Sequence, residues 1–422
     1  MISSAFRASL VWSWRLLIFV VVFFNARLYW PSPLASHDDT LPPSLVAQLD
    51  ANRAAIDGGC PANMQQLFPE GYYFSYVFHG LAWVELAIRD ETYSQKAISE
   101  SLQCLSQLES AEGRRPFPSD LPPDHGMFYS AWKCSLRSGV VLLQDGNDPQ
   151  QLENLRDECD AISDAIQASP TPFLASYRGS AWPCDTIPGI HALVVYDRIT
   201  KEDRYTEFVK SWLQDARLRT DPETGLLPHT ASLPDGRNVG VARATSQVIM
   251  LRYLPDIDPA FAKDQYQRFR DRYQSSFFGA PCVLEYPSGI TGRGDVDSGV
   301  LIFGRSITGT VVTIAIAQVY GDRDVAHAIA QCGETIGLPW TSGGQKQYVG
   351  GIMPIGNIIV AYSHVARPWF AGSDHHPDTR WKLSSMWRWQ IHAMSMLVFL
   401  PIITRRIIRR KKDQAAVDAE TS

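Results

Sequence analysis

The chain alternates between segments that are apolar at nearly every position and segments that are apolar on one face only. Residues 72–88 and 187–199 are rich in aromatic and aliphatic side chains, whereas residues 92–108 carry polar side chains at helical spacing. Both patterns predict helices. In the second pattern the apolar residues recur at intervals of three and four positions, and in the first the positions between them are apolar as well. We expect helices over residues 43–56, 72–88, 92–108, 127–143, 149–168, 187–199, 205–218, 241–253, 259–273, 301–320, 323–336 and 352–364.

Several of these helices pair across short turns, such as Arg89-Asp90-Glu91 and Gly321-Asp322. Within a pair, an apolar helix precedes a more polar one. Inner helices that are packed all round, surrounded by half-exposed outer helices, would give this pattern. We therefore predict an all-α fold, an (α/α)6 toroid of about six helical hairpins. A superhelical solenoid would need a recurring sequence period, and the chain has none.

Both ends of the chain have the composition of membrane helices. Residues 10–30 are apolar except for Arg15, Asn25 and Arg27, and no small-x-small cleavage pattern follows them. Aromatic residues at both sides of this segment are typical of interfacial anchors. A second apolar segment, residues 387–403, precedes a cluster of arginines and lysines. Such a cluster favours the cytoplasmic side of a membrane.

These features divide the chain into four parts: an uncleaved N-terminal anchor over residues 1–35, a barrel domain over 40–375, a second transmembrane or interfacial helix over 384–404, and a basic cytoplasmic tail over 405–422. Both termini are then expected to be cytoplasmic, and the body extracytoplasmic at an inner or plasma membrane. The second segment contains His392 and Pro401 and begins with tryptophans. It could therefore also lie on the membrane surface as an amphipathic helix.

Charge and cysteine usage exclude some classes of function. The formal net charge is -5 and charges of both signs are mixed throughout, so nucleic acid is not an expected partner. The seven cysteines form no CxxC pair and no Cys/His cluster, so we expect neither a metal site nor another cofactor. Outside the cytoplasm they could form up to three disulfides.

Long connections rich in proline, glycine and aromatic residues separate the helical pairs, at residues 109–125, 169–185, 221–238 and 277–299. We expect them to gather at one end of the barrel and to build a cavity mouth. The third helical pair is preceded by Cys184-Asp185. A helix N-terminus favours anions and lowers the pKa of a thiol, which makes this pair a candidate for chemistry. The same pair also fits a buried small residue followed by a helix N-cap.

The chain carries, in this order, Cys184-Asp185, VVYDRIT at 194–200, Arg204-Tyr205, Trp212, DPETG at 221–225, DPAF at 258–261, GDVDSG at 294–299 and Tyr320-Gly321-Asp322. This series of residues resembles the linalool dehydratase/isomerase family of (α/α) barrel enzymes. Weaker similarity occurs at HGLA, residues 79–82, and at MFY, residues 127–129. The resemblance therefore spans roughly residues 72–321.

What the resemblance implies is acid-base chemistry on a tertiary allylic alcohol in an apolar cavity, performed by cysteines with tyrosine, histidine and aspartate. Cys184 matches one of the family's cysteines, while residues 174–183 hold no counterpart of the other. Trp132 stands where the family has its histidine, and residues 243–246 lack the expected tyrosine. The family's set of catalytic residues is thus mostly unmatched.

The residues themselves indicate a set of candidate groups. Two carboxylates that face one cavity can divide the roles of acid and base when their surroundings separate their pKa values. Asp297 precedes Ser298-Gly299 and would also suit a helix N-cap, and His79 would also suit a core histidine. Candidate catalytic residues are Cys184, Asp185, Glu285 and Asp297, and candidate substrate-binding residues are Tyr73, His79, Tyr129, Trp132, Trp182, His229, Arg243, Tyr286 and Asp295.

Three functions remain open at this point, and each takes a hydrophobic or a glycan ligand. The first is a lyase or isomerase that acts on a hydrophobic alcohol through Cys184 and Asp185. The second is a glycan-active hydrolase or lyase, which would use Asp185 with Asp297 or Glu285 as its carboxylate pair. The third is a non-catalytic envelope module that binds lipid or glycan. The two enzyme hypotheses rest mainly on analogy of fold.

Overall fold

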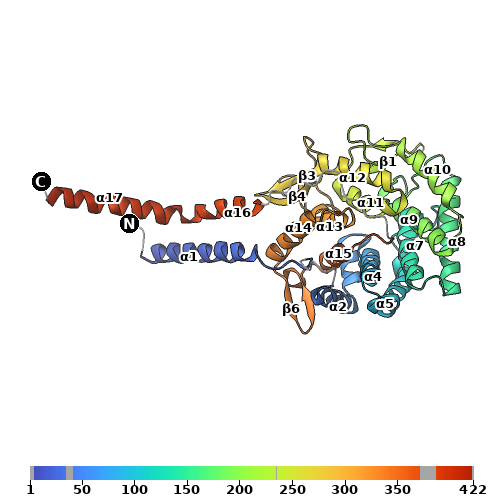
Figure 1. Ribbon diagram of the computed structural model, residues 1–422, viewed down its shortest axis with the longest axis horizontal. Helices are drawn as coiled ribbons and strands as arrows, with labels where there is room; N and C mark the ends of the chain where they lie inside the picture. Colours follow the sequence, from blue (N-terminus) through green and yellow to red (C-terminus); the bar gives the residue numbers. More distant parts are fainter. Residues whose placement is uncertain (1–3, 35–40, 234, 371–385, 421–422) are drawn as a thin grey trace.

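The computed structural model describes residues 4–34, 41–233, 235–370 and 386–420. It is mostly helical, with a body from which two long helices project side by side, and both chain ends lie at their far end (Figure 1). The boundaries expected at residues 35, 40, 375 and 384 lie outside the described residues. The first projecting helix is α1 (Ser4–Arg27), and the second consists of α16 (Trp387–Met396), η3 (Leu397–Phe399) and α17 (Leu400–Glu420).

Each predicted helix overlaps a helix of the body. The helices are α2 (Pro43–Asp57), α3 (Cys60–Leu67), α4 (Gly71–Arg89), η1 (Glu91–Tyr93), α5 (Ser94–Leu108), α6 (Ala111–Arg114), α7 (Gly126–Leu143), α8 (Pro149–Gln167), α9 (Pro183–Thr200), α10 (Thr206–Arg217), α11 (Ala244–Ile257), α12 (Pro259–Tyr273), α13 (Ile307–Val319), α14 (Arg323–Ile336), η2 (Val349–Gly351) and α15 (Pro354–Val365).

Six of these helices, called the central helices here, follow one another as neighbours. Helix α4 packs against α7, α7 against α9, α9 against α11, α11 against α13, α13 against α15, and α15 against α4 again. The more polar helix of each pair lies outside them, for example α5 against α4 and α14 against α13. Burial follows this arrangement, because α4 is buried along almost its whole length and α8 along one face only.

Local sequence sets many helix boundaries. Asp148, Asp258 and Ser306 cap α8, α12 and α13 by accepting hydrogen bonds from backbone N–H groups of the first turn at 2.8–3.1 Å. Helices α8, α9, α12 and α15 also have proline in the first turn, where its missing N–H costs nothing. These are start signals that can be read directly from sequence.

The connections contain short antiparallel strands, which the periodicity did not predict. They form the pair β1 (Thr230–Ala231) and β2 (Asn238–Val239), the sheet β3 (Gln274–Phe277), β4 (Ala280–Leu284) and β5 (Arg305–Ser306), and the hairpin β6 (Trp340–Ser342) and β7 (Gln345–Gln347). Gly343 and Gly344 make the β6–β7 turn with positive φ angles of 57° and 79°. Strand β5 also explains why α13 begins at Ile307 and not at residue 301.

Polar side chains join the two long helices close to the body. Asn25 of α1 donates to the Ser395 hydroxyl at 2.8 Å, and its Oδ1 lies 2.6 Å from His392 Nδ1. The Tyr29 hydroxyl lies 2.8 Å from the other ring nitrogen of His392. Residues 9–27 and 387–412 are long and apolar enough to cross a membrane. This polar cluster therefore holds two candidate spans in register.

A buried ion pair crosses the interior of the body. Arg252 of α11 binds Glu85 of α4 through Nη2, and both side chains are almost fully excluded from solvent. Glu85 also accepts hydrogen bonds from Trp369 Nε1 at 3.0 Å and from the Arg367 backbone N–H at 3.1 Å. Beside this pair, His191 Nε2 lies 3.2 Å from the Asp256 carboxylate. The cluster thereby ties the segment after α15 to α4, α9 and α11.

We predict that Arg252→Met lowers the free energy of unfolding by about 3–5 kcal/mol, because it leaves the buried Glu85 carboxylate without its cation. Chemical denaturation of the detergent-solubilised chain, followed by circular dichroism, measures this change. The control is Glu207→Gln, which removes an exposed ion pair with Lys210 and should change stability by less than about 1 kcal/mol. Equal stability of the two variants would contradict the prediction.

Candidate functional site

The candidate residues gather where the central helices begin. Asp185 lies in the first turn of α9, Arg243 is the N-cap residue of α11, and Glu70 is the N-cap residue of α4. The opposite helix ends are joined by short turns, so the long connections lie together with these N-termini. Backbone hydrogen bonds tie the connections to the helices, as from Ala244 N to the Glu285 carbonyl at 2.9 Å. The site is therefore built from segments distant in sequence.

Asp185 is the most strongly perturbed carboxyl group of this site. Its side chain is buried and accepts a hydrogen bond from Ser176 Oγ at 2.6 Å. Burial, together with the nearby charges of Asp297 and Glu70, raises its pKa to about 7, although the Ser176 hydroxyl and the Trp132 side chain oppose the rise. Trp132 Nε1 is buried and has no hydrogen-bond partner within bonding distance among the described residues. Near neutral pH, Asp185 can therefore both donate and accept a proton.

Cys184 does not have the lowered pKa expected at a helix N-terminus. Its thiol is buried and lies 3.8 Å from Asp185 Oδ1. Burial raises the pKa of Cys184 well above its ordinary value, and the charges of Asp185 and Asp297 add to this effect. The helix dipole is too weak to offset the loss of solvation. Cys184 is thus a neutral thiol. Cys184 and Asp185 both lie inside the first turn of α9, because the N-cap residue is Trp182.

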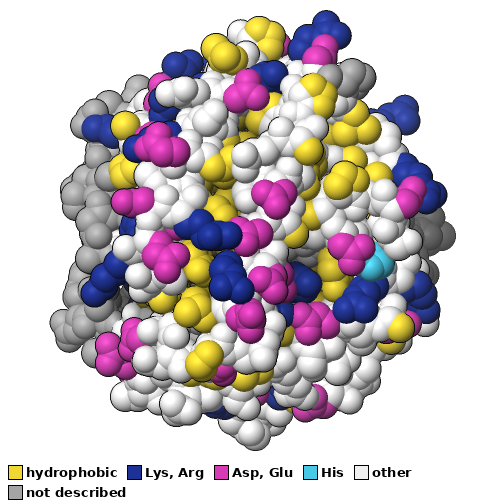
Figure 2. All heavy atoms as spheres, turned by 90° about the vertical axis from the view of Figure 1, so that its right-hand side faces the viewer, with side chains coloured by type: hydrophobic (Ala, Val, Ile, Leu, Met, Phe, Trp, Pro, Cys, Tyr) yellow, Lys and Arg dark blue, Asp and Glu magenta, His cyan; other side chains and the backbone are white. Residues whose placement is uncertain are grey.

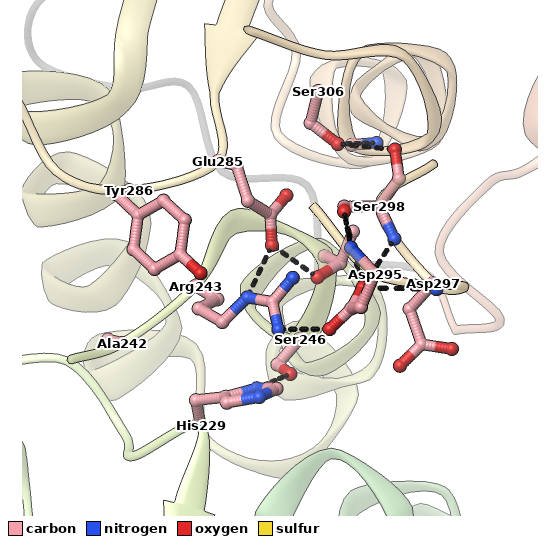
Figure 3. A network of polar contacts seen from close by, with 12 residues as sticks. His229, Ala242, Arg243, Ser246, Glu285, Tyr286, Asp295, Asp297, Ser298 and Ser306 are labelled. Carbon is pink, nitrogen blue, oxygen red and sulfur yellow. Dashed lines mark hydrogen bonds and ion pairs between the residues drawn. The ribbon is translucent and has the colours of Figure 1, made fainter. Parts of the chain in front are cut away.

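Arg243 organises a second group of carboxylates (Figure 3). Its Nε atom donates to Glu285 Oε1 at 2.8 Å, and its Nη1 atom binds Asp295. Glu285 is completely buried and accepts a further hydrogen bond from Thr245 at 2.8 Å, yet burial raises its pKa. Asp295 is more exposed, and its hydrogen bonds to Arg243 and Ser298 lower its pKa to about 2 in spite of partial burial. Arg243 therefore keeps Asp295 ionised.

Asp297, unlike its neighbour Asp295, forms no ion pair with Arg243. It is not a helix N-cap, because Ser306 caps α13 and Asp297 lies in the loop before β5. Figure 3 shows its carboxylate pointing away from Arg243. Asp297 is accessible to solvent but surrounded by protein on several sides, and this partial burial, with the charges of Asp295 and Glu70, raises its pKa to about 6. Its charge also reaches Asp185, Cys184 and Tyr177.

His229 joins the two groups through a serine. Its Nδ1 atom lies 2.6 Å from the Ser246 hydroxyl of α11, and the Ser246 side chain also reaches the Cys184 thiol. Burial and the positive charge of Arg243 lower the pKa of His229 to about 4. The ring is therefore neutral at physiological pH and can orient Ser246, but it does not act as a cation.

The predicted aromatic residues divide into two sets. Trp182 lies beside the site with its ring 6.0 Å from Tyr177, and Tyr286 lies under the Arg243 guanidinium at 5.4 Å. Tyr73 and Tyr129 pack together in the core between α4 and α7, where Tyr73 donates to the Tyr129 carbonyl at 2.5 Å. Both tyrosines are thus committed to core packing.

His79 is not brought to this site. Its side chain is fully buried, with Nε2 3.2 Å from both Glu100 of α5 and Trp83 of α4. Burial lowers its pKa. His79 therefore lies between α4 and α5, as the alternative interpretation of it as a core histidine predicts.

The cysteines and the acidic groups form neither disulfides nor metal clusters in the described part of the chain. All seven cysteines are free thiols, although Cys134 and Cys159 lie with their sulfur atoms 3.7 Å apart. Among the described residues, no three His, Cys, Asp or Glu side chains are grouped as metal ligands.

Three residues of the site were missed by the sequence analysis: Glu70, Ser176 and Ser246. Glu70 accepts a hydrogen bond from the Tyr177 hydroxyl, and its charge acts on both Asp185 and Asp297. It stands in Pro69-Glu70-Gly71, which reads as an ordinary turn. Their position along the chain could have identified these residues. Glu70 and Ser246 lie at the starts of α4 and α11, and Ser176 lies in the connection before α9.

No protein-family model matches the chain, and no curated protein matches it.

We predict that Asp185→Asn makes the protein relatively more stable at high pH. The folded protein holds the Asp185 proton up to about pH 7, whereas the unfolded chain releases it near pH 4, so wild-type stability falls between these values. Asparagine has no proton to lose. The difference in unfolding free energy, variant minus wild type, should therefore increase by on the order of 2 kcal/mol from pH 5 to pH 8.

Thermal and chemical unfolding of the detergent-solubilised chain at both pH values measures this difference. The exposed carboxylate Asp264, which pairs with Arg268, provides the control variant Asp264→Asn, whose stability should follow that of the wild type. A difference that does not change with pH would show that Asp185 ionises near the ordinary pKa of an aspartate.

Proposed function

We propose that the body is an (α/α)6 toroid whose inner ring is formed by the central helices α4, α7, α9, α11, α13 and α15. The return of their neighbour contacts from α15 to α4 supports a closed ring. The outer helices α2, α5, α8, α10, α12 and α14 complete the pairs. In this arrangement all inner helices run in one direction, so their N-termini surround a single opening at which Asp185, Arg243 and Glu70 meet.

We further propose that α1 and the segment α16–α17 cross the membrane, with both termini in the cytoplasm and the body outside it. The basic residues of α17 from Arg405 to Lys412 support this orientation. The polar cluster around Asn25 and His392 lies on the side where the two helices face each other, which keeps it away from lipid.

This topology can be tested with single cysteines introduced at Lys210 of α10 and at Lys412. A membrane-impermeant maleimide should label Lys210→Cys in intact cells and Lys412→Cys only after lysis. The unsubstituted chain serves as the blank, because its own cysteines are buried or half-buried. Labelling of Lys412→Cys in intact cells would contradict the proposed orientation.

The activity we propose is acid-base elimination or isomerisation of a hydrophobic alcohol. Asp185 is the general acid, because its buried carboxyl group keeps its proton up to about pH 7. Asp297 is the general base, because it is accessible and ionises at a lower pH, near 6. The observation that carries the proposal is this pair of interacting carboxyl groups with separated pKa values, at the start of α9 and in the loop before β5.

The reaction balances without a cofactor. Asp185 donates its proton to the substrate hydroxyl, the C–O bond breaks, and water leaves. Asp297 removes a proton from the adjacent carbon, and the electrons of that C–H bond form the C=C bond. Proton transfer through the released water returns the two carboxyl groups to their starting states. Addition of water in the reverse sense at another carbon would complete an isomerisation.

The charge balance of the site supports a cationic transition state. Of the five acidic groups Asp185, Asp297, Glu70, Asp295 and Glu285, two pair with Arg243: Glu285 with its Nε atom and Asp295 with its Nη1 atom. Asp297 and Glu70 are then available to stabilise positive charge that develops as the C–O bond breaks. Cys184 acts as a positioning residue, since its neutral thiol contacts Asp185 and not a reacting atom.

Of the family's catalytic cysteines only one is matched, by Cys184, and Cys184 has a positioning role here, so the proposal depends on the carboxyl pair and not on the family's catalytic set. A glycan-active hydrolase or lyase would use the same pair, since cleavage of a glycosidic bond also needs a protonated acid beside a carboxylate. The two activities differ in their products, an alkene or rearranged alcohol in one case and new sugar ends in the other.

We predict that Asp185→Asn and Asp297→Asn each lower kcat/KM by about 10²- to 10⁴-fold, because each removes one partner of the acid-base pair. The wild-type kcat/KM should follow a bell-shaped pH profile with its maximum between about pH 6 and pH 7, where Asp297 has ionised and Asp185 has not. Asp297→Asn should remove the acidic limb of this profile.

The assay offers the purified chain a panel of hydrophobic tertiary alcohols and of envelope oligosaccharides, with products separated by mass spectrometry. Asp264→Asn is the control for a surface carboxylate. Conversion of oligosaccharides alone would favour the glycan activity. Binding without conversion, unchanged in both active-site variants, would leave the non-catalytic module as the function.

A further inference from the structure

The exposed apolar side chains of the body are unevenly distributed. Of fifteen exposed large hydrophobic side chains in the described body, six lie within residues 278–307 and six within residues 336–353. Among them Phe303 is 79% exposed, Ile336 74% and Trp340 71%. Exposed apolar residues that are scattered singly need no explanation, whereas a concentration of this kind indicates an interaction surface.

Both segments lie where the long helices join the body. The β3–β4 turn is in close contact with α16, because a side chain at Gly279 would collide with the Trp387 carbonyl. On the other side, Thr335 at the end of α14 donates to the Arg27 carbonyl of α1 at 3.0 Å, and Gln331 donates to the Trp30 carbonyl at 3.0 Å. The apolar side chains thus flank the base of each candidate span.

The arrangement of elements agrees with this placement. Figure 1 shows the β3–β4 hairpin and the β6 hairpin on the side of the body from which the long helices leave, one on either side of them. Phe278, at the tip of the first hairpin, packs on Phe277 with a centroid distance of 4.5 Å, and Phe277 stacks on Phe303 at 6.0 Å. We call Phe278, Phe303, Ile336, Leu338 and Trp340 the apolar collar.

The opposite face of the body has another character. Figure 2 shows that face with acidic, basic and hydrophobic side chains interspersed over it and no broad area of a single charge. Leu218, at the end of α10, is a single exposed leucine on the far part of the molecule, 83% exposed. The apolar collar is therefore specific to the side of the anchors.

The same chain segment leads from the collar to the site. Residues 285–303 carry Glu285 at one end, Phe303 at the other, and Asp295 and Asp297 between them. Val296, between the two aspartates, is 60% exposed, and Val300 is 79% exposed. An alkyl chain could therefore follow exposed apolar side chains from the base of the anchors to the carboxylates.

Taking the proposed function as given, we propose that the apolar collar inserts into the bilayer surface and that the substrate is a membrane-dissolved, long-chain alcohol. It reaches Asp297 and Asp185 from the lipid along residues 296–303. The bilayer is the occupant of this surface, because the collar surrounds the two helices that enter it. Aromatic side chains at the collar, such as Trp340 and Phe303, are of the kind that favour the interface between lipid and water.

Membrane contact is tested separately from activity. Single cysteines replacing Trp340, Phe303 and, as the matched control, Leu218 are labelled with an environment-sensitive fluorophore in the full-length chain, reconstituted in phosphatidylcholine/phosphatidylglycerol vesicles. We expect a blue-shifted emission and several-fold stronger quenching by spin-labelled lipid at positions 340 and 303 than at 218. Equal quenching at all three positions overturns the proposal. A blue shift without quenching by lipid also overturns it, because contact with a second copy of the chain would cause that result.

The delivery route is tested with Phe303→Ser and Trp340→Ser. Each should lower kcat/KM about tenfold for a long-chain alcohol supplied in vesicles and leave kcat/KM for a short, water-soluble alcohol unchanged. Equal effects on both substrates would overturn the route. If the wild type converts neither alcohol while the lipid quenching is as expected, the proposed reaction has failed and the membrane contact stands.

Discussion

The buried pair of Glu85 and Arg252 is the interaction on which the arrangement of the central helices depends. It joins α4 to α11, which are three steps apart in the order of neighbours in either direction, so it spans the interior. Removing two charges from water is costly, and this cost is offset only where the charges have further partners. Glu85 binds Trp369 and the Arg367 N–H, Arg252 donates to the Arg367 carbonyl at 2.7 Å, and its guanidinium lies 5.4 Å from the Tyr253 ring. These contacts draw the segment after α15 across one end of the helices.

This segment lies at the C-terminal ends of the central helices, and the candidate residues lie at their N-termini. There, two physical effects oppose each other. Helix N-termini favour anions, whereas burial and mutual repulsion favour protonated carboxyl groups. The outcome differs from residue to residue because Arg243 pairs with Asp295 and Glu285 and not with Asp185. Arg243 holds Asp295 ionised, while Asp185, which has a serine as its partner and no cation, holds its proton to about pH 7. The position of one guanidinium thus separates the pKa values of Asp295 and Asp185.

Much of this organisation could be predicted from the sequence, and the limits of prediction have physical causes. The apolar pattern indicated the helices correctly, since this signal is local. The strands in the connections were missed, because each is short and depends on turns such as Phe278-Gly279 and not on periodicity. The start of α13 was placed too early for the same reason.

The site was partly predictable. Cys184, Asp185, Glu285, Arg243, Asp295 and Asp297 were selected from their connections and lie together, but the pKa of Cys184 was expected to fall and rises instead. Burial of a side chain depends on the whole fold, so a helix N-terminus seen in sequence cannot decide it. Glu70 was missed because its partner Tyr177 is more than one hundred residues away in the chain. Pairings of this kind are set by the order of the central helices and leave no local signal.

The placement of the anchors bears on how such a site could be used. In the arrangement that we propose, the central helices form a ring, and in Figure 1 the two long helices leave the body to one side of these helices. An opening at one end of the ring would then face along the membrane surface and not away from it. Residues 277–307 connect the anchors with the site, because they touch α16 at one end and supply Asp295 and Asp297 near the other. A hydrophobic molecule would lose little of its favourable transfer free energy on such a short path, about 0.8 kcal/mol for each CH2 group exposed to water. The anchors would therefore do more than hold the protein at the membrane, since they set the distance between lipid and the carboxyl groups.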